Sequence, residues 1–441
     1  SPTHTSHLRP ATSMMERSRI RLSRFAARMA PLAFLAALAG CDGSTGVIEP
    51  PDPKDCIDGV ANELYPCSNV NFLSSVSLEE IGESDQRAND IWGWTDPATG
   101  KEYALLGLTD GVAIFDITDG EEPVYVAKLP EPEKIIPRDI ASEAAGGAQA
   151  AFSPASGAGG APGPAGLPGF EFHDDQDSSG KGAAAWRDIK TYRNTMYVVS
   201  DESGRGMQVF DLEQLRGMNK SEMPVTLQHD FHYDLFGNAH NIAINEESGF
   251  AYVIGSYRGG TCASNGGLHI IDIRDRLRPV YAGCHVESTA GGYIRAGYIH
   301  DTQCVIYDGP DSEHKGKEIC MSSAEKRLLI SDVTDKSAPA SLAVYLYPGN
   351  HYAHQAWLTE DHRVLFLNDE LDELREGHNT RTILIDVSDL DSPRYLGYVQ
   401  HDTPAIDHNL YIRGNRMYQA NYLAGLQVFD VSDATPSGVE R

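Results

Sequence analysis

Short hydrophobic runs that end in aspartate recur along the chain from residue 75 onward. Each run combines β-branched, aliphatic and aromatic residues, and in five of the six copies a proline follows six or seven residues after the aspartate. Short Asp and Ser side chains hydrogen-bond to turn backbone, and proline fixes the start of the next strand, so each copy predicts a β-hairpin. The six copies are Val112–Asp119, Met207–Leu212, Leu268–Asp275, Leu328–Asp335, Thr382–Asp389 and Leu426–Asp433.

The spacing of these copies predicts a β-propeller. The aspartates that end the last four runs, Asp272, Asp332, Asp386 and Asp430, are 60, 54 and 44 residues apart. A period of this length, with about four short strands in each copy, suits a propeller blade and exceeds a leucine-rich or helical repeat. The array contains almost no amphipathic helix pattern. We therefore predict an all-β fold, a β-propeller of which six blades are visible in the sequence.

The two ends of the array bear on how the ring closes. Ser75–Ile81 has the pattern of a lone strand ahead of the first blade, which in propellers commonly completes the last blade. After Asp433 only residues 434–441 remain, too few for the inner strands of another blade. We expect a seven-bladed ring truncated at the C-terminus, with a closed six-bladed ring as the alternative. The propeller domain is expected over residues 70–441, with a disordered Ala/Gly/Pro-rich insertion at about residues 130–185.

Four of the predicted blades open with a histidine, a polar residue and a strand, whereas the two earlier copies open at Asn89 and Trp186. The first strand of every blade lines the central channel, so equivalent positions should converge at one mouth. Imidazoles arranged in this way bind Zn, Cu or Fe, which makes a divalent transition metal in the channel one hypothesis. The alternative is that these side chains hydrogen-bond between blades and lock the ring. The four histidines are His240, His300, His354 and His408.

The first forty residues have the composition of an export signal. A stretch with six arginines precedes the apolar run Met29–Ala39, which is too short to span a bilayer as a helix but suits a signal-peptide core. The run leads into Leu38–Cys41, which resembles a bacterial lipobox. That resemblance implies that residues 1–40 comprise upstream residues and a lipoprotein signal peptide, and that the Cys41 thiol carries a lipid.

Residues 41–69 are expected to form a flexible tether between the lipid and the folded domain, because residues 42–54 are rich in Gly, Pro, Ser and Asp. Asp42, directly after the lipidated cysteine, implies by the same resemblance that the protein stays on the inner membrane. We expect an exported protein that contacts a bacterial membrane through its lipid anchor, on the periplasmic or cell-surface side.

The cysteine count agrees with export. Lipidation of Cys41 leaves six cysteines, and an even number in an exported chain suggests disulfides, although connectivity does not follow from sequence alone. Cys304 and Cys320 flank a polar loop between two strand-like runs, as a cross-strand bridge requires. No C-x2-C spacing supports a metal site at these residues. Pairing sequence neighbours is the simplest choice and gives Cys56–Cys67, Cys262–Cys284 and Cys304–Cys320.

The net charge of the chain excludes nucleic acid as a partner. The chain carries 36 basic and 63 acidic residues, a formal charge of -27, which gives nucleic acid no electrostatic footprint and favours cations or basic partners. No G-x-S-x-G motif and no P-loop occurs, so hydrolase or nucleotide chemistry has no support.

Two acidic stretches are weaker candidates for a cation site. Asp175, Asp177 and Ser179 resemble the opening of a calcium loop, but Trp186 stands where the bidentate Glu is expected, so we interpret this stretch as an acidic linker. The second stretch precedes His378 and is interpreted as a solvated loop. Its acids are Asp369, Glu370, Asp372, Glu373 and Glu376.

The repeats resemble LVIVD repeats, and residues 70–433 resemble the choice-of-anchor B family. The resemblance rests on Trp186–Lys190, Ser200–Glu202, Gly206–Asp211 and Ala239–Asn241 as well as on the hairpin runs. It implies an exported propeller whose surface attachment varies between members, here the lipobox, and it implies no particular reaction. The insertion at about residues 130–185 and the missing final blade depart from the pattern.

Taken together, these features predict a lipid-anchored β-propeller that acts as a binding or interaction module for a protein or glycan ligand at the channel mouth. The alternative is a metal-dependent, oxidoreductase-like enzyme that uses the four channel histidines.

Overall fold

The computed structural model describes residues 55–62, 64–137, 186–257, 262 and 265–432. The expectations for Cys41, the signal segment and the Asp175–Asp177 stretch lie outside these residues. The chain divides into two compact units, residues 1–71 and 72–441. In the first, β1 (Val60–Ala61) pairs antiparallel with β2 (Tyr65–Pro66), next to the Cys56–Cys67 disulfide. Within the described ranges, no helix has both the length and the apolar character that crossing a membrane requires.

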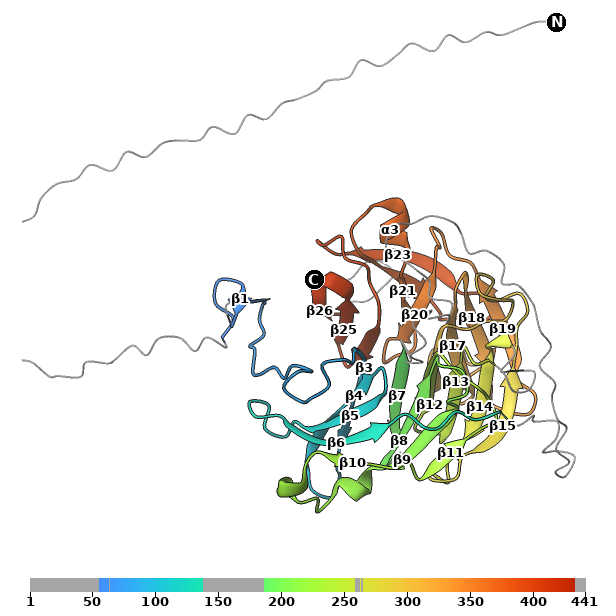
Figure 1. The fold of residues 1–441 in the computed structure, drawn as a ribbon. Helices are drawn as coiled ribbons and strands as arrows, with labels where there is room; N and C mark the ends of the chain where they lie inside the picture. Colours follow the sequence, from blue (N-terminus) through green and yellow to red (C-terminus); the bar gives the residue numbers. More distant parts are fainter. Residues whose placement is uncertain (1–54, 63, 138–185, 258–261, 263–264, 433–441) are drawn as a thin grey trace, which may run out of the picture. The chain divides into compact units, whose positions relative to one another are not determined.

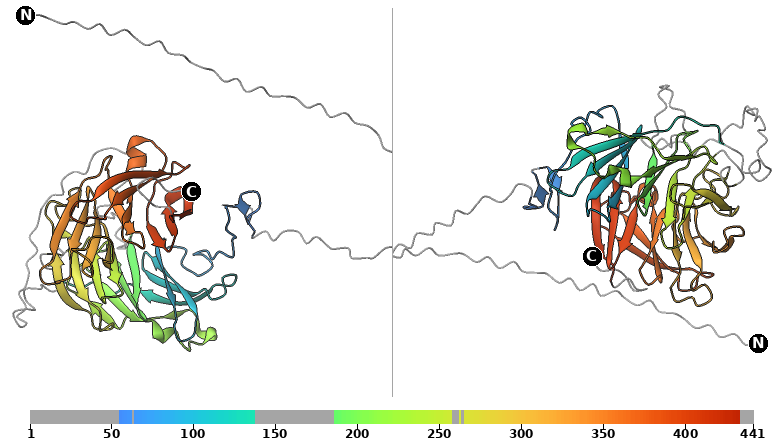
Figure 2. Two further views of the ribbon diagram at one scale, coloured as in Figure 1. Left: turned by 180° about the vertical axis from the view of Figure 1, so that it is seen from behind. Right: turned by 90° about the horizontal axis from the view of Figure 1, so that it is seen from below.

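The second unit is all-β and has the six-bladed propeller arrangement (Figure 1). Its sheets fan around a common centre, with β3, β7, β12 and β20 on the inner side, and the same arrangement is visible from behind and from below in Figure 2. The first sheet contains β3 (Ala88–Thr95), β4 (Glu102–Leu108), β5 (Gly111–Asp116), β6 (Val124–Pro130) and, parallel to β6, β10 (Val225–Thr226). The second contains β7 (Arg187–Tyr192), β8 (Thr195–Ser200), β9 (Met207–Asp211) and β11 (Phe231–Tyr233).

The next three sheets are four-stranded antiparallel meanders. They contain β12 (Asn241–Asn245), β13 (Phe250–Ile254), β14 (Leu268–Asp272) and β15 (Val280–His285); β16 (Asp301–Ile306), β17 (Glu318–Ala324), β18 (Arg327–Asp332) and β19 (Ala340–Tyr345); and β20 (Ala353–Leu358), β21 (Val364–Asp369), β22 (Arg381–Asp386) and β23 (Arg394–Gln400).

The sixth sheet has three strands, and the described helices are short. The strands are β24 (Leu410–Arg413), β25 (Arg416–Asn421) and β26 (Gly425–Asp430). The helices are α3 (Asp372–Glu376) and the 3-10 turns η1 (Leu212–Leu215), η2 (Lys220–Glu222) and η3 (Tyr422–Ala424).

The hairpin aspartates take the local role that the repeat predicted. In every blade the carboxylate accepts a hydrogen bond from the backbone N–H two residues later, at 2.9 to 3.1 Å. Each side chain thus fixes the turn after its own strand. The six residues are Asp116, Asp211, Asp272, Asp332, Asp386 and Asp430.

Successive blades pack face to face through apolar side chains. Leu105 and Val112 of the first blade, for example, lie in one buried cluster with Ile189 and Met196 of the second. Polar side chains of the inner strands add hydrogen bonds across the same interfaces. The Asp188 carboxylate accepts from the backbone N–H of Ile242 in the next blade, at 2.7 Å. Burial of apolar faces supplies most of the stability, and the hydrogen bonds set the register between neighbouring sheets.

The first and sixth blades meet at the centre through Trp92 of β3 and Tyr411 of β24, whose ring centroids are 5.8 Å apart. The described residues form the six blades that the sequence predicted, and their arrangement is that of a six-bladed propeller, the alternative to a truncated seven-bladed ring. Ser75–Ile81 is not a strand, which corrects the expectation that it completes the last blade. Leu78 and Ile81 instead pack against the first blade beside Phe115.

Two further expectations can be compared with the structure. All three disulfides have the predicted pairing, and Cys304 and Cys320 lie directly opposite each other on β16 and β17. The first residues of the Ala/Gly/Pro-rich insertion, by contrast, are ordered, which corrects the expectation of disorder there. Glu131 forms an ion pair with Arg205, and the backbone N–H of Ile135 donates to the carbonyl of Gly204, so this part packs on the second blade.

Candidate site at the channel mouth

The four predicted histidines lie at the starts of the innermost strands of the last four blades. His240 and His300 directly precede β12 and β16, His354 lies in β20, and His408 lies two residues before β24. Every blade runs in the same direction, so these positions lie at the same end of the propeller. The repeat therefore places one imidazole per blade at one mouth of the channel.

The structure brings all four rings together in a row. Ring centroids are 4.3 Å apart between His240 and His300, 4.3 Å between His300 and His354, and 4.2 Å between His354 and His408. The row stops at the second blade, where Arg187 takes the equivalent position. Arg187 donates from Nε to the carbonyl of Leu108 in the first blade, at 3.0 Å, so its guanidinium serves a blade contact.

Two of the histidines also support the structural hypothesis. His300 donates from Nδ1 to the carbonyl of His354 in the next blade, at 3.1 Å, which fixes the position of the His354 backbone. His240 Nδ1 lies 3.0 Å from the Asp201 carboxylate. Burial opposes charge on the His240 ring, but Asp201 and then Asp301 outweigh it and raise the pKa of His240 to about 9.

The other three imidazoles are held neutral. Burial and then the neighbouring His240 ring keep the pKa of His300 well below its usual range. Burial, with His408 and His300 alongside, does the same for the pKa of His354. Burial and then His240 lower the pKa of His408 to about 4. Neutral imidazole is the form that coordinates metal ions.

A carboxylate that the sequence analysis placed in a solvated loop joins the row. Glu370 Oε2 is 3.6 Å from His354 Nε2, and Glu370 Oε1 is 3.8 Å from His408 Nε2. Glu370 directly follows β21, whose last residue, Asp369, lies opposite Ala353 at the start of β20. Antiparallel pairing thus brings the end of one strand beside the histidine of its neighbour. Only the pairing register of these two strands could have identified Glu370 as a neighbour of His354.

His354, His408 and Glu370 have the geometry of a metal-binding triad. Their ligand atoms all lie within 4.8 Å of one another. Two ligands bound to one tetrahedral ion at about 2.1 Å are about 3.4 Å apart, close to the two measured separations. Burial raises the pKa of Glu370 to about 7, against the opposing effect of the Tyr422 hydroxyl that donates to Oε1.

The channel beside the row is filled by side chains. Lys190 of β7 forms an ion pair with Asp188 and lies 4.5 Å from the centre of the Trp92 ring. Tyr411 packs edge-on against both Trp92 and Trp357. These groups satisfy one another, so a ligand of the triad must approach from the histidine end.

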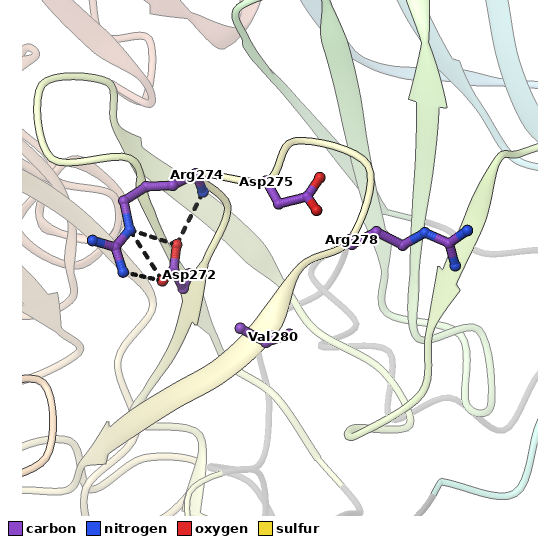
Figure 3. A pocket seen from close by; sticks show the side chains of 5 residues that line it. All are labelled: Asp272, Arg274, Asp275, Arg278 and Val280. Atoms are coloured by element: carbon purple, nitrogen blue, oxygen red, sulfur yellow. Dashed lines mark hydrogen bonds and ion pairs between the residues drawn. The ribbon is translucent and has the colours of Figure 1, made fainter.

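A surface hollow lies at the end of the third blade away from the histidine row, and it is a weaker candidate for a ligand site. Asp272, Arg274, Asp275, Arg278 and Val280 line it, and Figure 3 shows Arg274 paired with Asp272 while Arg278 extends away from that pair. The strand register places Asp272 at the edge of the sheet away from His240. Its charged groups are occupied by turn contacts rather than directed at a ligand.

The acidic stretch after β21 is buried, which corrects its interpretation as a solvated loop. Asp369, Asp372 and Glu373 are at most 5% exposed. Only Glu376, whose side chain is 56% exposed, behaves as expected. The run of charges does not extend into solvent because α3 folds back between β21 and β22, where the backbone N–H of Arg381 donates to Glu373.

Comparisons with known proteins give weak structural similarities and no sequence match. No family model matches it, and no curated protein matches it by sequence. A solved protein of unknown function from Desulfotomaculum acetoxidans shares 10% identity over 78% of this chain and 83% of its own, with a TM-score of 0.47. A periplasmic gluconolactonase from Pseudomonas aeruginosa shares 13% identity over 57% of this chain and 69% of its own, with a TM-score of 0.40. Neither similarity bears on activity.

Proposed function

We propose that this protein is an exported β-propeller that binds one divalent transition-metal ion at its channel mouth and acts as a metal-dependent enzyme. The observation that carries the proposal is the set of three ligand atoms from His354, His408 and Glu370, all within 4.8 Å of one another. The two imidazoles are neutral, and the ring of His354 is nearly fully buried. The carboxyl of Glu370, whose pKa burial raises to about 7, must lose its proton when an ion binds, so metal affinity should rise with pH.

The donor set favours catalysis over a purely structural ion. Structural zinc sites are closed by four protein ligands, whereas three protein ligands leave open positions for water or substrate. Two histidines and one carboxylate are also the ligands of non-haem iron oxygenases, so an oxidoreductase reaction is the class we favour. His300 would act as a positioning residue, because its hydrogen bond to the His354 carbonyl fixes the backbone of that ligand.

Aromatic side chains around the row suggest what the site accepts. Tyr422 packs edge-on against His408 at 5.3 Å and is 46% exposed. Tyr352 contacts His300 at 5.3 Å, and the partly exposed Tyr293 stacks on Tyr352. Such a rim favours an organic substrate with an apolar or aromatic face.

The proposed location is extracytoplasmic. Three disulfides fit an oxidising compartment. We extend this to anchoring by a lipid on Cys41 and to membership of the choice-of-anchor B family, both on the sequence resemblance alone. Metabolic labelling with a radioactive fatty acid tests the anchor: Cys41→Ser should abolish incorporation, and continued labelling of that variant would contradict it.

Metal content tests the function. The full-length protein, purified without chelator, should contain one equivalent more of a transition metal than the His354→Ala/His408→Ala variant, as measured by mass spectrometry of the element. The matched control His229→Ala/His362→Ala removes two histidines that lie outside the row and should leave metal content unchanged. Equal metal in the first variant and the wild type would overturn the proposal.

A metal-free binding module is the second candidate. It is favoured by the contacts of His300 with the next blade and of His240 with Asp201, which show that these rings also serve the architecture. Under this alternative the His354→Ala/His408→Ala variant would lose thermal stability without losing metal. Capture of a defined glycan or protein by the wild type, unchanged by a chelator, would then support the module.

A further inference from the structure

A second group of potential ligands lies on α3 and the loop that follows it. Asp372 and Glu373 open the helix and are 2% and 5% exposed, and His378 follows it. These residues offer ligand atoms that all lie within 4.8 Å of one another. His378 Nε2 is 3.6 Å from Asp372 Oδ2, a separation suited to two ligands of one ion.

The atoms that face this point lack partners. Asp372 Oδ1, Glu373 Oε2 and His378 Nε2 are buried, and none has a hydrogen-bond partner among the described residues. His378 Nδ1 donates to the carbonyl of Asn379 at 2.8 Å, which leaves Nε2 on the side of Asp372. Leaving buried polar atoms without partners is costly. A cation bound by all three atoms would satisfy them together.

The local charge supports the same conclusion. Asp369 and Asp407, both fully buried, lie close to this pair of acids. Among the ion pairs that involve described residues, these acids are paired with no lysine or arginine, and the partner of Asp372 is His378. Several buried acids thus lie together around Asp372 and Glu373.

We propose that Asp372, Glu373 and His378 bind a divalent cation of the zinc type, separate from the ion at His354 and His408. Two carboxylates and one imidazole are ligands that zinc accepts, and the bound ion would cancel the repulsion between the acids. Because Glu373 also accepts from the backbone of Arg381, the ion would fasten α3 to β22. That contact holds the segment that carries Glu370. The proposal does not depend on the function proposed above.

Zinc titration of chelator-treated full-length protein tests the second site. By isothermal titration calorimetry, Asp372→Asn/Glu373→Gln should bind one zinc fewer than the wild type. The control Glu376→Gln, an exposed acid on the same helix, should bind as many as the wild type. His378→Ala provides an independent variant and should also lose one zinc. Unchanged stoichiometry in both site variants would overturn the proposal.

The result for the second site can be distinguished from the result for the site at the channel mouth. If His354→Ala/His408→Ala keeps the wild-type number of zinc ions while Asp372→Asn/Glu373→Gln loses one, the function proposed above fails and the second site stands. Folding is controlled by melting in chelator: without zinc, Asp372→Asn/Glu373→Gln should melt no lower than the wild type, because it removes buried repulsion. A smaller zinc-induced rise in melting temperature than the wild type shows is expected for this variant. A full rise would contradict the site.

Discussion

Two sets of carboxylates in this propeller differ in what satisfies them. The hairpin aspartates each accept a backbone N–H two residues away, and contacts of this kind lower the pKa of Asp386 against the opposing effect of burial. Burial instead raises the pKa of Asp369, Asp372 and Glu373, and it outweighs the backbone N–H groups that donate to Asp369 and Glu373. The repeated set fixes the turn in every blade, whereas the second set occurs in one blade only and includes the residues for which we propose a bound ion.

The largest expected effect on stability comes from removing bound metal, which should act through the proposed metal sites and not through the hairpin aspartates. A chelator in excess should lower the free energy of unfolding by about 4 kcal/mol for each ion that had been present at about 1,000 times its dissociation constant. The loss should be absent in a variant that combines His354→Ala/His408→Ala with Asp372→Asn/Glu373→Gln. Denaturant unfolding with and without chelator measures it. An equal loss in that variant would place the ions elsewhere.

The next effect tests the hairpin set. Asp386→Ala removes the acceptor for the Ser388 N–H and should cost about 2 kcal/mol, with or without chelator. Asp386→Asn keeps an acceptor oxygen and should recover most of that loss. Urea unfolding measures both variants. If chelator changes the cost of Asp386→Ala, the two sets are not independent.

A buried histidine that stays neutral in the folded protein provides a further test of the comparison between the two sets. Burial lowers the pKa of His269 to about 3, below the 6.5 expected in the unfolded chain. As pH falls from 6.5 toward 3, the unfolded state takes up a proton that the folded state does not, so stability falls by up to about 1.4 kcal/mol per pH unit. Above pH 6.5 this contribution is constant.

His269→Phe should remove that part of the slope. Its neighbours Tyr233 and Phe236 are aromatic, and the ring of the variant occupies similar space. Stability is compared by chemical unfolding at pH 4.5 and 7.5 with chelator present throughout. A difference between the two pH values that matches the wild type would show that His269 titrates normally.

The smallest expected effect tests whether the net charge of the acidic stretch, rather than particular ligand residues, contributes to stability. Glu376 has an exposed side chain and contacts His351 at 2.8 Å. Glu376→Gln should change stability by less than about 0.5 kcal/mol, since exposed ion pairs contribute little. Thermal melting with and without zinc measures this. A larger change would mean that the whole acidic stretch acts through its net charge rather than through particular ligands.

The repeat made much of this architecture predictable. The turn aspartates recur in all six blades and the histidines in the last four, so equivalent positions in the repeat take equivalent positions in the propeller. The disulfide pairing followed because its cysteines are close in sequence. Glu370 was missed because it occurs in one blade and becomes a neighbour of His354 only through strand register.

Burial could not be predicted where it depends on contacts between segments. Ser75–Ile81 has a strand pattern, but Leu78 and Ile81 pack as an irregular segment against the first blade. The acids of α3 have the composition of a solvated loop, and only the position of α3 between β21 and β22 excludes water from them. Local composition carries no information about either contact.

Anomalous diffraction from a crystal of the full-length protein grown with zinc tests the central claim most directly. We predict a peak at the zinc edge about 2.1 Å from His354 Nε2, His408 Nε2 and a Glu370 oxygen. A map with no peak at that position would contradict the account of the channel mouth.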